Sequence, residues 1–446
     1  MRKLIATVLL LAVAISTSAK GGSRLTYGTP ESAGMNGAYL TRTIDSIANQ
    51  AIAERCFPGC QILVARHGKI VHHKSYGHHT YACTQPVKNS HLYDIASCTK
   101  VMAATLCMMR MVEEGKISLD APLSDYIEEL RGSDKEGTTI REFMTHQGGL
   151  TAVSLRRIFF NENKELNEEL FRKVESKDFP YKVCDSLYAS KDIHSRWLTE
   201  IANSRLREKK LLYSCLSFHC YPTLVKRITG RDYEEYLYNE FYAPLGITQG
   251  AMYNPTRRFP LSKIVPTEID GYIRKGLIHG YVHDEAAASL GGVSGNAGLF
   301  ANAESLAVIL QMLLNGGEYN GVRYFDSRTI REWTICQYPE NDNYRGIGFD
   351  ARRFNDRIIF EKRGYYYARS ASMASYGHSG FTGTMVWVDP AEELIFVFLS
   401  NRVHPSRRNE NFSRLNPRAN CHEAAYEAIR RHIEQQVTLP TKENWR

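Results

Sequence analysis

Apolar positions recur with a helical period near the N-terminal end of the chain and form strand-like runs directly after it. Residues 38–55 carry apolar side chains three or four positions apart, so this segment predicts an amphipathic helix. Residues 60–65 and 69–73 are short apolar runs rich in β-branched side chains. Because a glycine-containing turn separates them, the two runs predict a β-hairpin.

The middle of the chain predicts helices and loops, and strand-like runs return toward the C-terminal end. Residues 101–112 are the most apolar helical segment of the chain. They predict a buried helix that begins just before this run, so that Ser97 lies in its first turn. From Lys100 to about Trp333 the pattern is helical or loop-like, without an internal repeat. The later elements are four strand-like runs at 346–349, 358–360, 383–389 and 394–399, a turn at 390–393, and a closing amphipathic helix at 418–436.

Strands at both ends with helices between them predict one α+β domain. We expect an antiparallel sheet that is built from both termini and flanked by helices, with a large helical insertion. The sheet subdomain would take about residues 20–95 and 340–446, and the helical subdomain about 96–339. A cleft between the sheet and the helices would then contain Ser97.

The first 19 residues have the pattern of a secretory signal peptide. Arg2 and Lys3 precede an apolar run at residues 4–15, and small residues end the segment. A membrane anchor, the alternative, needs roughly 20 apolar residues, and this run has about 12. We therefore expect the domain 20–446 to be secreted across the inner membrane, periplasmic if the source is Gram-negative, without an integral membrane segment, and monomeric.

Charge and cysteine content narrow the choice of partners. The formal charge is +8, and loss of Arg2 and Lys3 with the signal segment leaves +6. The densest basic group is the set of arginines within residues 402–418, and no aromatic-interleaved basic motif of a nucleic-acid site accompanies it. We expect a solvated face and no nucleic-acid partner. The ten cysteines are irregularly spaced, so mostly reduced thiols are expected.

Ser97 and Lys100 form the only Ser-x-x-Lys pattern in the chain. Three residues on a helix make almost one turn, so the Lys100 side chain can reach back to the Ser97 hydroxyl. A desolvated lysine can act as the base for a serine, and a helix N-terminus favours an oxyanion beside it. An ordinary helix start with a surface lysine has the same spacing, so the pair alone is a hypothesis of acyl transfer.

Several ordered segments carry a family resemblance from about Leu25 to the closing helix. The chain resembles serine hydrolases of the class C β-lactamase and penicillin-binding-protein-like superfamily. The segments are 93–100 at the nucleophile motif, 139–150 at a structural signature, Tyr213-Ser214-Cys215 at the family's Tyr-x-Asn, and 376–384 at its Lys/His-x-Gly strand. Residues 282–300 are similar to an exported bacterial branch described as carboxypeptidases or esterases.

The resemblance implies a nucleophile and a base. Ser97 is the expected nucleophile, and Tyr213 is expected to pair with Lys100 as base and proton shuttle. From the residues alone, a half-buried structural tyrosine is the favoured interpretation of Tyr213. The resemblance favours the catalytic interpretation.

The resemblance also implies an oxyanion hole and a substrate-positioning strand. The backbone N–H groups of Ser97 and Phe381 are the expected oxyanion donors. His378 and Gly380 are expected to position the substrate, because a glycine lets a substrate backbone approach closely.

Two residues depart from the family pattern. Cys215 replaces an asparagine that in this family contacts the Lys100 equivalent and the substrate, and a thiol offers only one weak donor. His378 replaces a lysine, which removes a permanent charge for a substrate carboxylate. Both changes argue against an efficient β-lactamase.

The remaining polar cluster, His283-Asp284-Glu285, reads as a conformational anchor, since the chain has no Gly-x-Ser-x-Gly elbow for a triad. No metal-binding or phosphate-binding motif is present in the sequence, so no metal or other cofactor is expected.

These observations predict an exported serine hydrolase that forms an acyl-enzyme at Ser97. The expected substrate is a small ester or a peptidoglycan-type D-amino-acid peptide, as for an esterase or DD-carboxypeptidase. The alternatives are a weak class C-type β-lactamase and a non-catalytic binding protein of the same fold.

Overall fold

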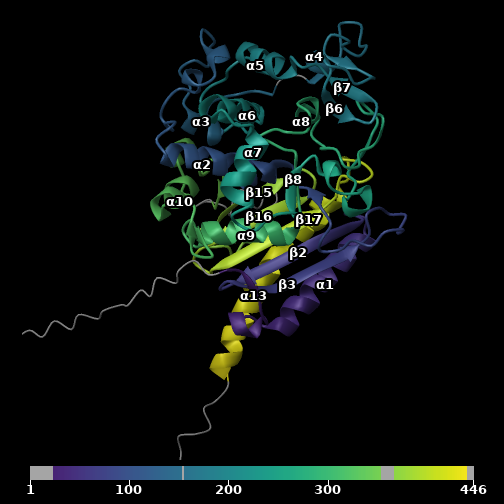
Figure 1. The fold of residues 1–446 in the computed structure, drawn as a ribbon. Coiled ribbons are helices and arrows are strands. Elements are labelled where there is room, and N and C mark those ends of the chain that lie inside the picture. The colour runs from purple at the N-terminus through teal and green to yellow at the C-terminus, as the bar shows by residue number, and fades with distance from the viewer. Residues whose placement is uncertain (1–23, 153–154, 353–365, 439–446) are drawn as a thin grey trace, which may run out of the picture.

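The computed structural model describes residues 24–152, 155–352 and 366–438. The expected signal peptide and the strand-like run at 358–360 lie outside these residues. Figure 1 shows a sheet region that contains both ends of the described chain, with a helical region above it. No helix in the described part of the chain has the length and apolarity needed to cross a membrane.

A seven-stranded sheet organises the fold, in the order β1-β3-β2-β17-β16-β15-β14. These strands are β1 (Thr26–Tyr27), β3 (Lys69–Gly77), β2 (Gly59–Arg66), β17 (Leu394–Ser400), β16 (Thr384–Asp389), β15 (Tyr376–Gly380) and β14 (Asp350–Ala351). β1 pairs with β3 in parallel, and the other pairs of described strands in this sheet are antiparallel. The expected sheet from both termini is confirmed, with this one parallel pair as a correction.

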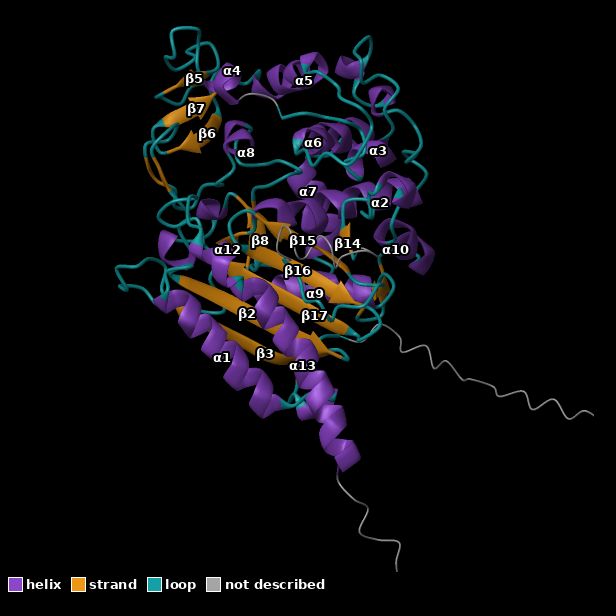
Figure 2. Ribbon diagram, turned by 180° about the vertical axis from the view of Figure 1, so that it is seen from behind, coloured by secondary structure: helices purple, strands orange, loops and turns teal. Residues whose placement is uncertain are grey.

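Helices cover both faces of the sheet. α1 (Gly37–Ala53) and α13 (Pro417–Thr438) lie on one face, as Figure 2 shows, and α9 (Ala303–Leu314) lies on the other. Side chains alternate along β2, so Ile62 joins the core under α1 and α13 while Leu63 joins the core under α9. A strand buried on both faces is continuously apolar, which is why residues 60–65 show no polar alternation.

The helical region also contains short strands. Its helices are α2 (Thr105–Glu113), α3 (Ile140–Met144), α4 (Leu155–Phe159), α5 (Ile193–Asn203), α6 (Leu216–Thr229), α7 (Tyr233–Leu237), α8 (Glu285–Ser289) and α10 (Ser327–Thr334). Two small sheets join β4 (Tyr93–Asp94), β11 (Leu299–Ala301) and β8 (Ala251–Tyr253), and β5 (Phe171–Arg172), β7 (Leu187–Ala189) and β6 (Tyr181–Cys184). Two further strand pairs are β9 (Ile269–Asp270) with β10 (Gly276–Leu277) and β12 (Glu318–Tyr319) with β13 (Val322–Arg323). A short helix near the C-terminal end of the chain is α12 (Asn411–Leu415).

The longer predicted elements are confirmed. They are the helix at 38–55, the hairpin at 60–73, the closing hairpin with its turn at 390–393, and the closing helix. The region from Lys100 to Trp333 is largely helical and loop-like, as predicted, but the prediction omitted the short strands β5 to β13. Strands of two to four residues are too short to produce a readable period.

Two further predictions are corrected near the serine. The single helix at 101–112 is instead a 3₁₀ turn (Ala96–Cys98), a π-helical turn (Lys100–Ala104) and then α2. 3₁₀ turns at helix ends and single π turns within helices are too short to change the period of the apolar residues, so the sequence does not separate them. Residues 346–349 are not a strand. Their glycines permit close packing: a Cβ on Gly348 would lie 2.2 Å from Thr105 Oγ1.

Candidate active site

Ser97 lies in a tight turn at the end of β4. The residue before it, Ala96, has a φ of +47°, in the left-handed region that a residue with a Cβ seldom adopts. The Asp94 carboxylate stabilises this backbone, because Oδ1 accepts a hydrogen bond from the Ala96 N–H at 2.8 Å. Asp94 Oδ2 accepts a second bond from the His283 N–H at 2.6 Å. The serine is therefore presented by a strained turn that its neighbours fix.

Lys100 is fully buried behind Ser97. Its Nζ donates to Ser97 Oγ at 3.1 Å, to Cys215 Sγ at 3.3 Å and to the Asn296 carbonyl oxygen at 3.3 Å. Burial lowers the pKa of Lys100, but the facing Cys215 and Tyr213 groups raise it more, so the net shift is upward. The ammonium has three partners, which fix it on the serine.

Tyr213 approaches Ser97 from the other side. Its hydroxyl donates to Ser97 Oγ at 3.0 Å, so the serine oxygen accepts from both Tyr213 and Lys100. Burial of the hydroxyl raises the pKa of Tyr213, and the Lys100 ammonium opposes this shift. Cys215, two residues further on, directly precedes α6 and contacts Lys100 through its sulfur.

His146 is a residue of this site that sequence reasoning did not assign. Its ring packs against Tyr213 with centroids 4.4 Å apart. Its carbonyl oxygen accepts from the Leu212 N–H at 3.0 Å, and its Nδ1 accepts from the Ser214 N–H at 3.2 Å. The segment 139–150 was read only as a structural signature, and a contact with a residue more than 60 positions away leaves no mark in it.

β15 packs directly on the serine turn. A Cβ on Gly380 would lie 2.0 Å from Thr384 Oγ1 and 2.4 Å from the Ile95 carbonyl oxygen, so only glycine fits here. The turn that follows is tied to the same segment, because Thr382 Oγ1 donates to the Asp94 carbonyl oxygen at 2.8 Å. This contact places the Phe381 backbone beside the serine turn.

His378 is buried and neutral. Its Nδ1 lies 2.8 Å from the Ser379 carbonyl oxygen, which only accepts, so Nδ1 carries the hydrogen. Burial lowers the pKa of His378 to about 4, and the Arg345 and Lys100 charges act in the same direction, whereas Asp350 opposes them. Its Nε2 is an acceptor without a partner among the described residues.

These residues share one cleft of about 680 Å³. Of the seven residues predicted from the sequence, six line it and Lys100 lies just behind: the six are Ser97, Tyr213, Cys215, His378, Gly380 and Phe381. The cleft also contains four residues that no motif in the sequence marked, because they come from separate loops and helices: Arg345, Arg402, Arg418 and Asp350. Asp284, from the cluster that the sequence analysis interpreted as a conformational anchor, lines the cleft too.

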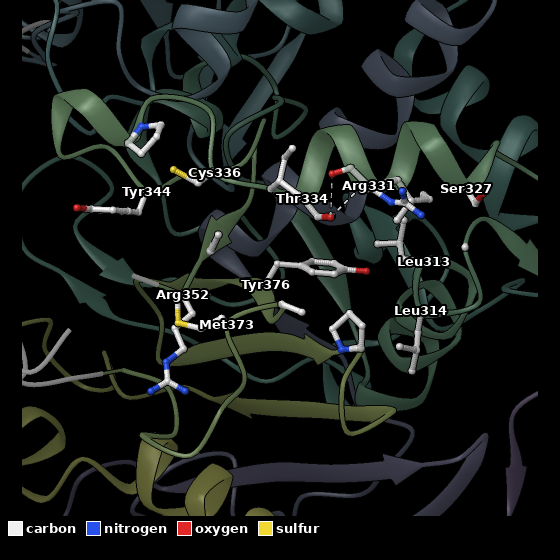
Figure 3. A pocket seen from close by; sticks show the side chains of 17 residues that line it. Leu313, Leu314, Ser327, Arg331, Thr334, Cys336, Tyr344, Arg352, Met373 and Tyr376 are labelled. Carbon is white, nitrogen blue, oxygen red and sulfur yellow. Dashed lines mark hydrogen bonds between the residues drawn. The ribbon is translucent and has the colours of Figure 1, made fainter. Parts of the chain in front are cut away.

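A second cavity of about 800 Å³ lies between the end of α9, α10 and β15 (Figure 3). Its wall is mostly apolar and includes Leu313, Met373 and Tyr376. None of its lining residues lines the cleft around Ser97. The chemistry therefore belongs to the smaller cleft.

The His283-Asp284-Glu285 cluster supports the wall of the cleft through contacts with Glu268, Arg407 and Phe381. His283 Nε2 lies 2.8 Å from Glu268 Oε2, and Arg407 Nε donates to the same oxygen at 2.6 Å. The His283 ring stacks on Phe381 with centroids 5.7 Å apart. Burial raises the pKa of Glu268, but these hydrogen bonds lower it more, to about 2. A carboxylate paired in this way holds His283 against Phe381.

Comparison with known proteins identifies the family to which the chain belongs. A protein-family model described as "Beta-lactamase" matches residues 44–417. The chain belongs to the beta-lactamase family. The fold is the α+β fold of β-lactamases and transpeptidases, with class C enzymes and penicillin-binding-protein homologues among its structural neighbours.

Relatives of this beta-lactamase-family chain carry several names. It is 31% identical over 423 residues to an Escherichia coli O157:H7 protein named "Putative D-alanyl-D-alanine carboxypeptidase", covering 89% of each chain. Its structure is similar to EstCE1, "a hydrolase with promiscuous acyltransferase activity", with a TM-score of 0.62, 16% identity, and 87% and 99% coverage. The D-amino acid amidase of Ochrobactrum anthropi gives a TM-score of 0.60 at 16% identity, covering 88% and 99%. The family is one of serine hydrolases.

Proposed function

We propose that this beta-lactamase-family protein is an exported serine hydrolase that forms an acyl-enzyme at Ser97. Its substrate would be a small ester or a peptidoglycan-type D-amino-acid peptide. The observation that carries the proposal is that Ser97 Oγ accepts hydrogen bonds from both Lys100 Nζ and Tyr213 OH. Such convergence on one hydroxyl is the arrangement of an activated nucleophile.

The reaction follows from these contacts. Ser97 Oγ attacks the substrate carbonyl carbon while its proton passes to the Lys100–Tyr213 pair. The N–H groups of Ser97 and Phe381 stabilise the oxyanion. The bond to the leaving group then breaks, the leaving group takes the proton from the pair, and water hydrolyses the acyl-serine with the same groups as base and acid.

The protonation states of Lys100 and Tyr213 predict that the rate of acylation depends on pH. Both Lys100 and Tyr213 donate to Ser97, so one of them must lose a proton before it can accept that of the serine. The rate of acylation should therefore rise as the pH increases above neutrality.

The site keeps its contact between Lys100 and residue 215 although cysteine replaces the family's asparagine there. Its sulfur keeps a contact with Lys100 at 3.3 Å, where the family's asparagine would contact the lysine. This favours an enzyme over a binding protein with a degraded site. The weaker donor supports the expectation that β-lactam turnover is slow.

Intact-mass analysis of the mature protein after incubation with a fluorophosphonate probe tests the proposal. A single adduct that is absent in Ser97→Ala is expected, and a parallel incubation with a penicillin separates lasting acylation from turnover. A folded protein that forms no adduct with either reagent would refute catalysis at Ser97. Cell fractionation and size-exclusion chromatography test the proposed export and monomeric state.

A further inference from the structure

A chain of buried polar side chains lies behind Lys100. His219, Ser294 and Asn296 are 6%, 0% and 1% exposed. His219 Nδ1 lies 3.0 Å from Ser294 Oγ, and Ser294 Oγ donates to Asn296 Oδ1 at 2.8 Å. The Asn296 carbonyl oxygen accepts from Lys100 Nζ at 3.3 Å. A continuous set of contacts therefore joins the His219 ring to the ammonium of Lys100.

The acceptors in this chain determine where its hydrogens lie. Asn296 Oδ1 only accepts, so the hydroxyl hydrogen of Ser294 points to it and the serine oxygen acts as an acceptor toward His219. His219 Nδ1 must then carry the hydrogen that joins it to Ser294. Burial lowers the pKa of His219 to about 4, Asp284 opposes the shift, and the Lys100 charge reinforces it. The ring is therefore neutral near pH 7 and donates to Ser294.

The loop that contains Asn296 is packed closely against α6. A Cβ on Gly295 would lie 2.4 Å from the Phe218 carbonyl oxygen, so the backbone there has little room to move. The hydrogen bond from Ser294 fixes the Asn296 side chain within this loop. The carbonyl group of the same residue is thereby directed at Lys100.

α6 contacts Lys100 in two ways. Cys215 directly precedes this helix and His219 lies four positions later, so both residues lie on the same side of it. Cys215 Sγ accepts from Lys100 Nζ at 3.3 Å, whereas His219 acts through the Asn296 carbonyl oxygen. A thiol sulfur is a weak acceptor. The carbonyl is thus the stronger of the two partners that hold Lys100 besides Ser97.

We propose that His219 is a positioning residue for Lys100, acting through the carbonyl oxygen of Asn296. The inference rests on the proposed function and deepens it, because it identifies a residue that sets the pH at which a base becomes available to Ser97. A carbonyl oxygen that accepts from an ammonium stabilises its charged form. With His219 in place, Lys100 keeps its proton to a higher pH and stays directed at the serine.

Other groups also act on the charge of Lys100. Burial lowers the pKa of Lys100, whereas Cys215 and Tyr213 face the ammonium and raise it. The remaining titratable groups that interact with this charge are buried and uncharged near pH 7: Cys98, His146 and His378. All of these groups stay unchanged when His219 is replaced, so a shift in the pH dependence reports on the contact with Asn296.

The test measures the rate at which the fluorophosphonate labels Ser97 as a function of pH. His219→Ala removes the donor to Ser294 and loosens the Asn296 carbonyl. The rate should then begin to rise at a pH about one unit lower than in the wild-type protein, as expected for loss of a hydrogen bond to a charged group. His219→Asn keeps an N–H group at the position of Nδ1 and should return the profile toward that of the wild type.

His194→Ala is the matched control, because it removes a half-buried histidine of α5 whose ring packs on Tyr181. It should keep the wild-type pH profile. Ser294→Ala interrupts the same chain at its centre and should give the same shift, which covers the case in which His219→Ala folds poorly. Combining the two substitutions should produce no further shift, because both act on one set of contacts.

A lower labelling rate with an unchanged pH profile in His219→Ala would assign the histidine a structural role and overturn the proposal. An equal shift in His194→Ala, or additive shifts in the double variant, would overturn it as well. Ser97 would still be labelled in these cases. A failure of the wild-type protein to label at Ser97 would instead refute the proposed function, so the two failures are distinguishable.

Discussion

The imidazole ring of His146 lies against the phenol ring of Tyr213, with a distance of 4.4 Å between the ring centroids. His146 also binds the backbone on both sides of the tyrosine, through the N–H groups of Leu212 and Ser214. Burial, reinforced by the Arg345 and Lys100 charges, keeps the pKa of His146 well below its usual value. A neutral ring therefore holds the loop that aims Tyr213 at the serine.

This relationship predicts a positioning role for His146. His146→Ala should lower the fluorophosphonate labelling rate of Ser97 about 10- to 100-fold while Lys100 and Tyr213 are retained. His146→Asn should recover part of the rate, because its Oδ1 can accept the Ser214 N–H and asparagine tolerates the φ of +57°. If the asparagine variant is as slow as the alanine variant at equal stability, the side-chain hydrogen bond with the Ser214 N–H is not what positions Tyr213.

Removal of the Tyr213 hydroxyl tests the proton shuttle. Tyr213→Phe keeps the ring against His146 and removes the only Tyr213 atom that bonds Ser97 Oγ. Acylation measured by stopped-flow or timed mass analysis should slow about 10²- to 10⁴-fold, as expected for loss of a general base. Tyr238→Phe, on an exposed residue of the helical region, is the control and should label at the wild-type rate.

Substitution of Cys215 tests whether the thiol adapts the enzyme to another substrate or has impaired its activity. Cys215→Asn restores an amide beside Lys100, which should orient the ammonium more firmly and increase penicillin acylation. Turnover of a small ester, which carries no acylamino group, should change by less than about 3-fold. A large gain on every substrate would indicate that the thiol had damaged the enzyme, contrary to the proposal.

A methyl group at position 380 should abolish acylation. In Gly380→Ala the new Cβ would meet Thr384 Oγ1 and the Ile95 carbonyl oxygen, and the latter belongs to backbone that cannot yield easily. The strand would then move away from Ser97 and separate the two oxyanion donors. Gly137→Ala, where no atom lies within 4 Å of the new Cβ, should retain activity and stability. Wild-type labelling by Gly380→Ala would contradict the proposed oxyanion hole.

The buried His422 should make the fold sensitive to acid. Burial lowers its pKa to about 3, so between pH 6.5 and 3 the unfolded chain binds a proton there and the folded chain does not. Its contribution to stability is present above pH 6.5 and is lost as the pH falls. Urea unfolding should show that His422→Gln loses about 1–2 kcal/mol less than wild type between pH 7 and 5.

Local patterns and family motifs predicted the parts of the site that depend on nearby residues. Ser97 and Lys100 lie three positions apart, and the structure joins them by a hydrogen bond of 3.1 Å. The hairpin around Gly68 and the two closing strands could be predicted because each is long enough to show its period. Tyr213 and His378 depended on resemblance, since their neighbours in sequence do not mark them.

The rest of the site depends on tertiary contacts. Arg345 reaches the cleft from the loop before β14, and His146 reaches Tyr213 from the loop after α3. Neither has a local signature, because a buried arginine and a loop histidine look like any others in the sequence. The left-handed Ala96 was equally hidden, since its conformation is enforced by Asp94 and packing rather than by its own preference.

The pairing of β2 with β17 joins residues more than 300 positions apart, from Cys60 with Ser400 to Arg66 with Leu394. During synthesis the turn that contains Ser97 is made early, whereas β17, the strand that pairs with β2, is made near the end. Until β17 is made, β2 and β16 each have an open edge, because β17 is the strand that lies between them. A chain that ends before Leu394 would lack β17, the strand that joins the N-terminal and C-terminal parts of the sheet, and is expected not to complete the fold.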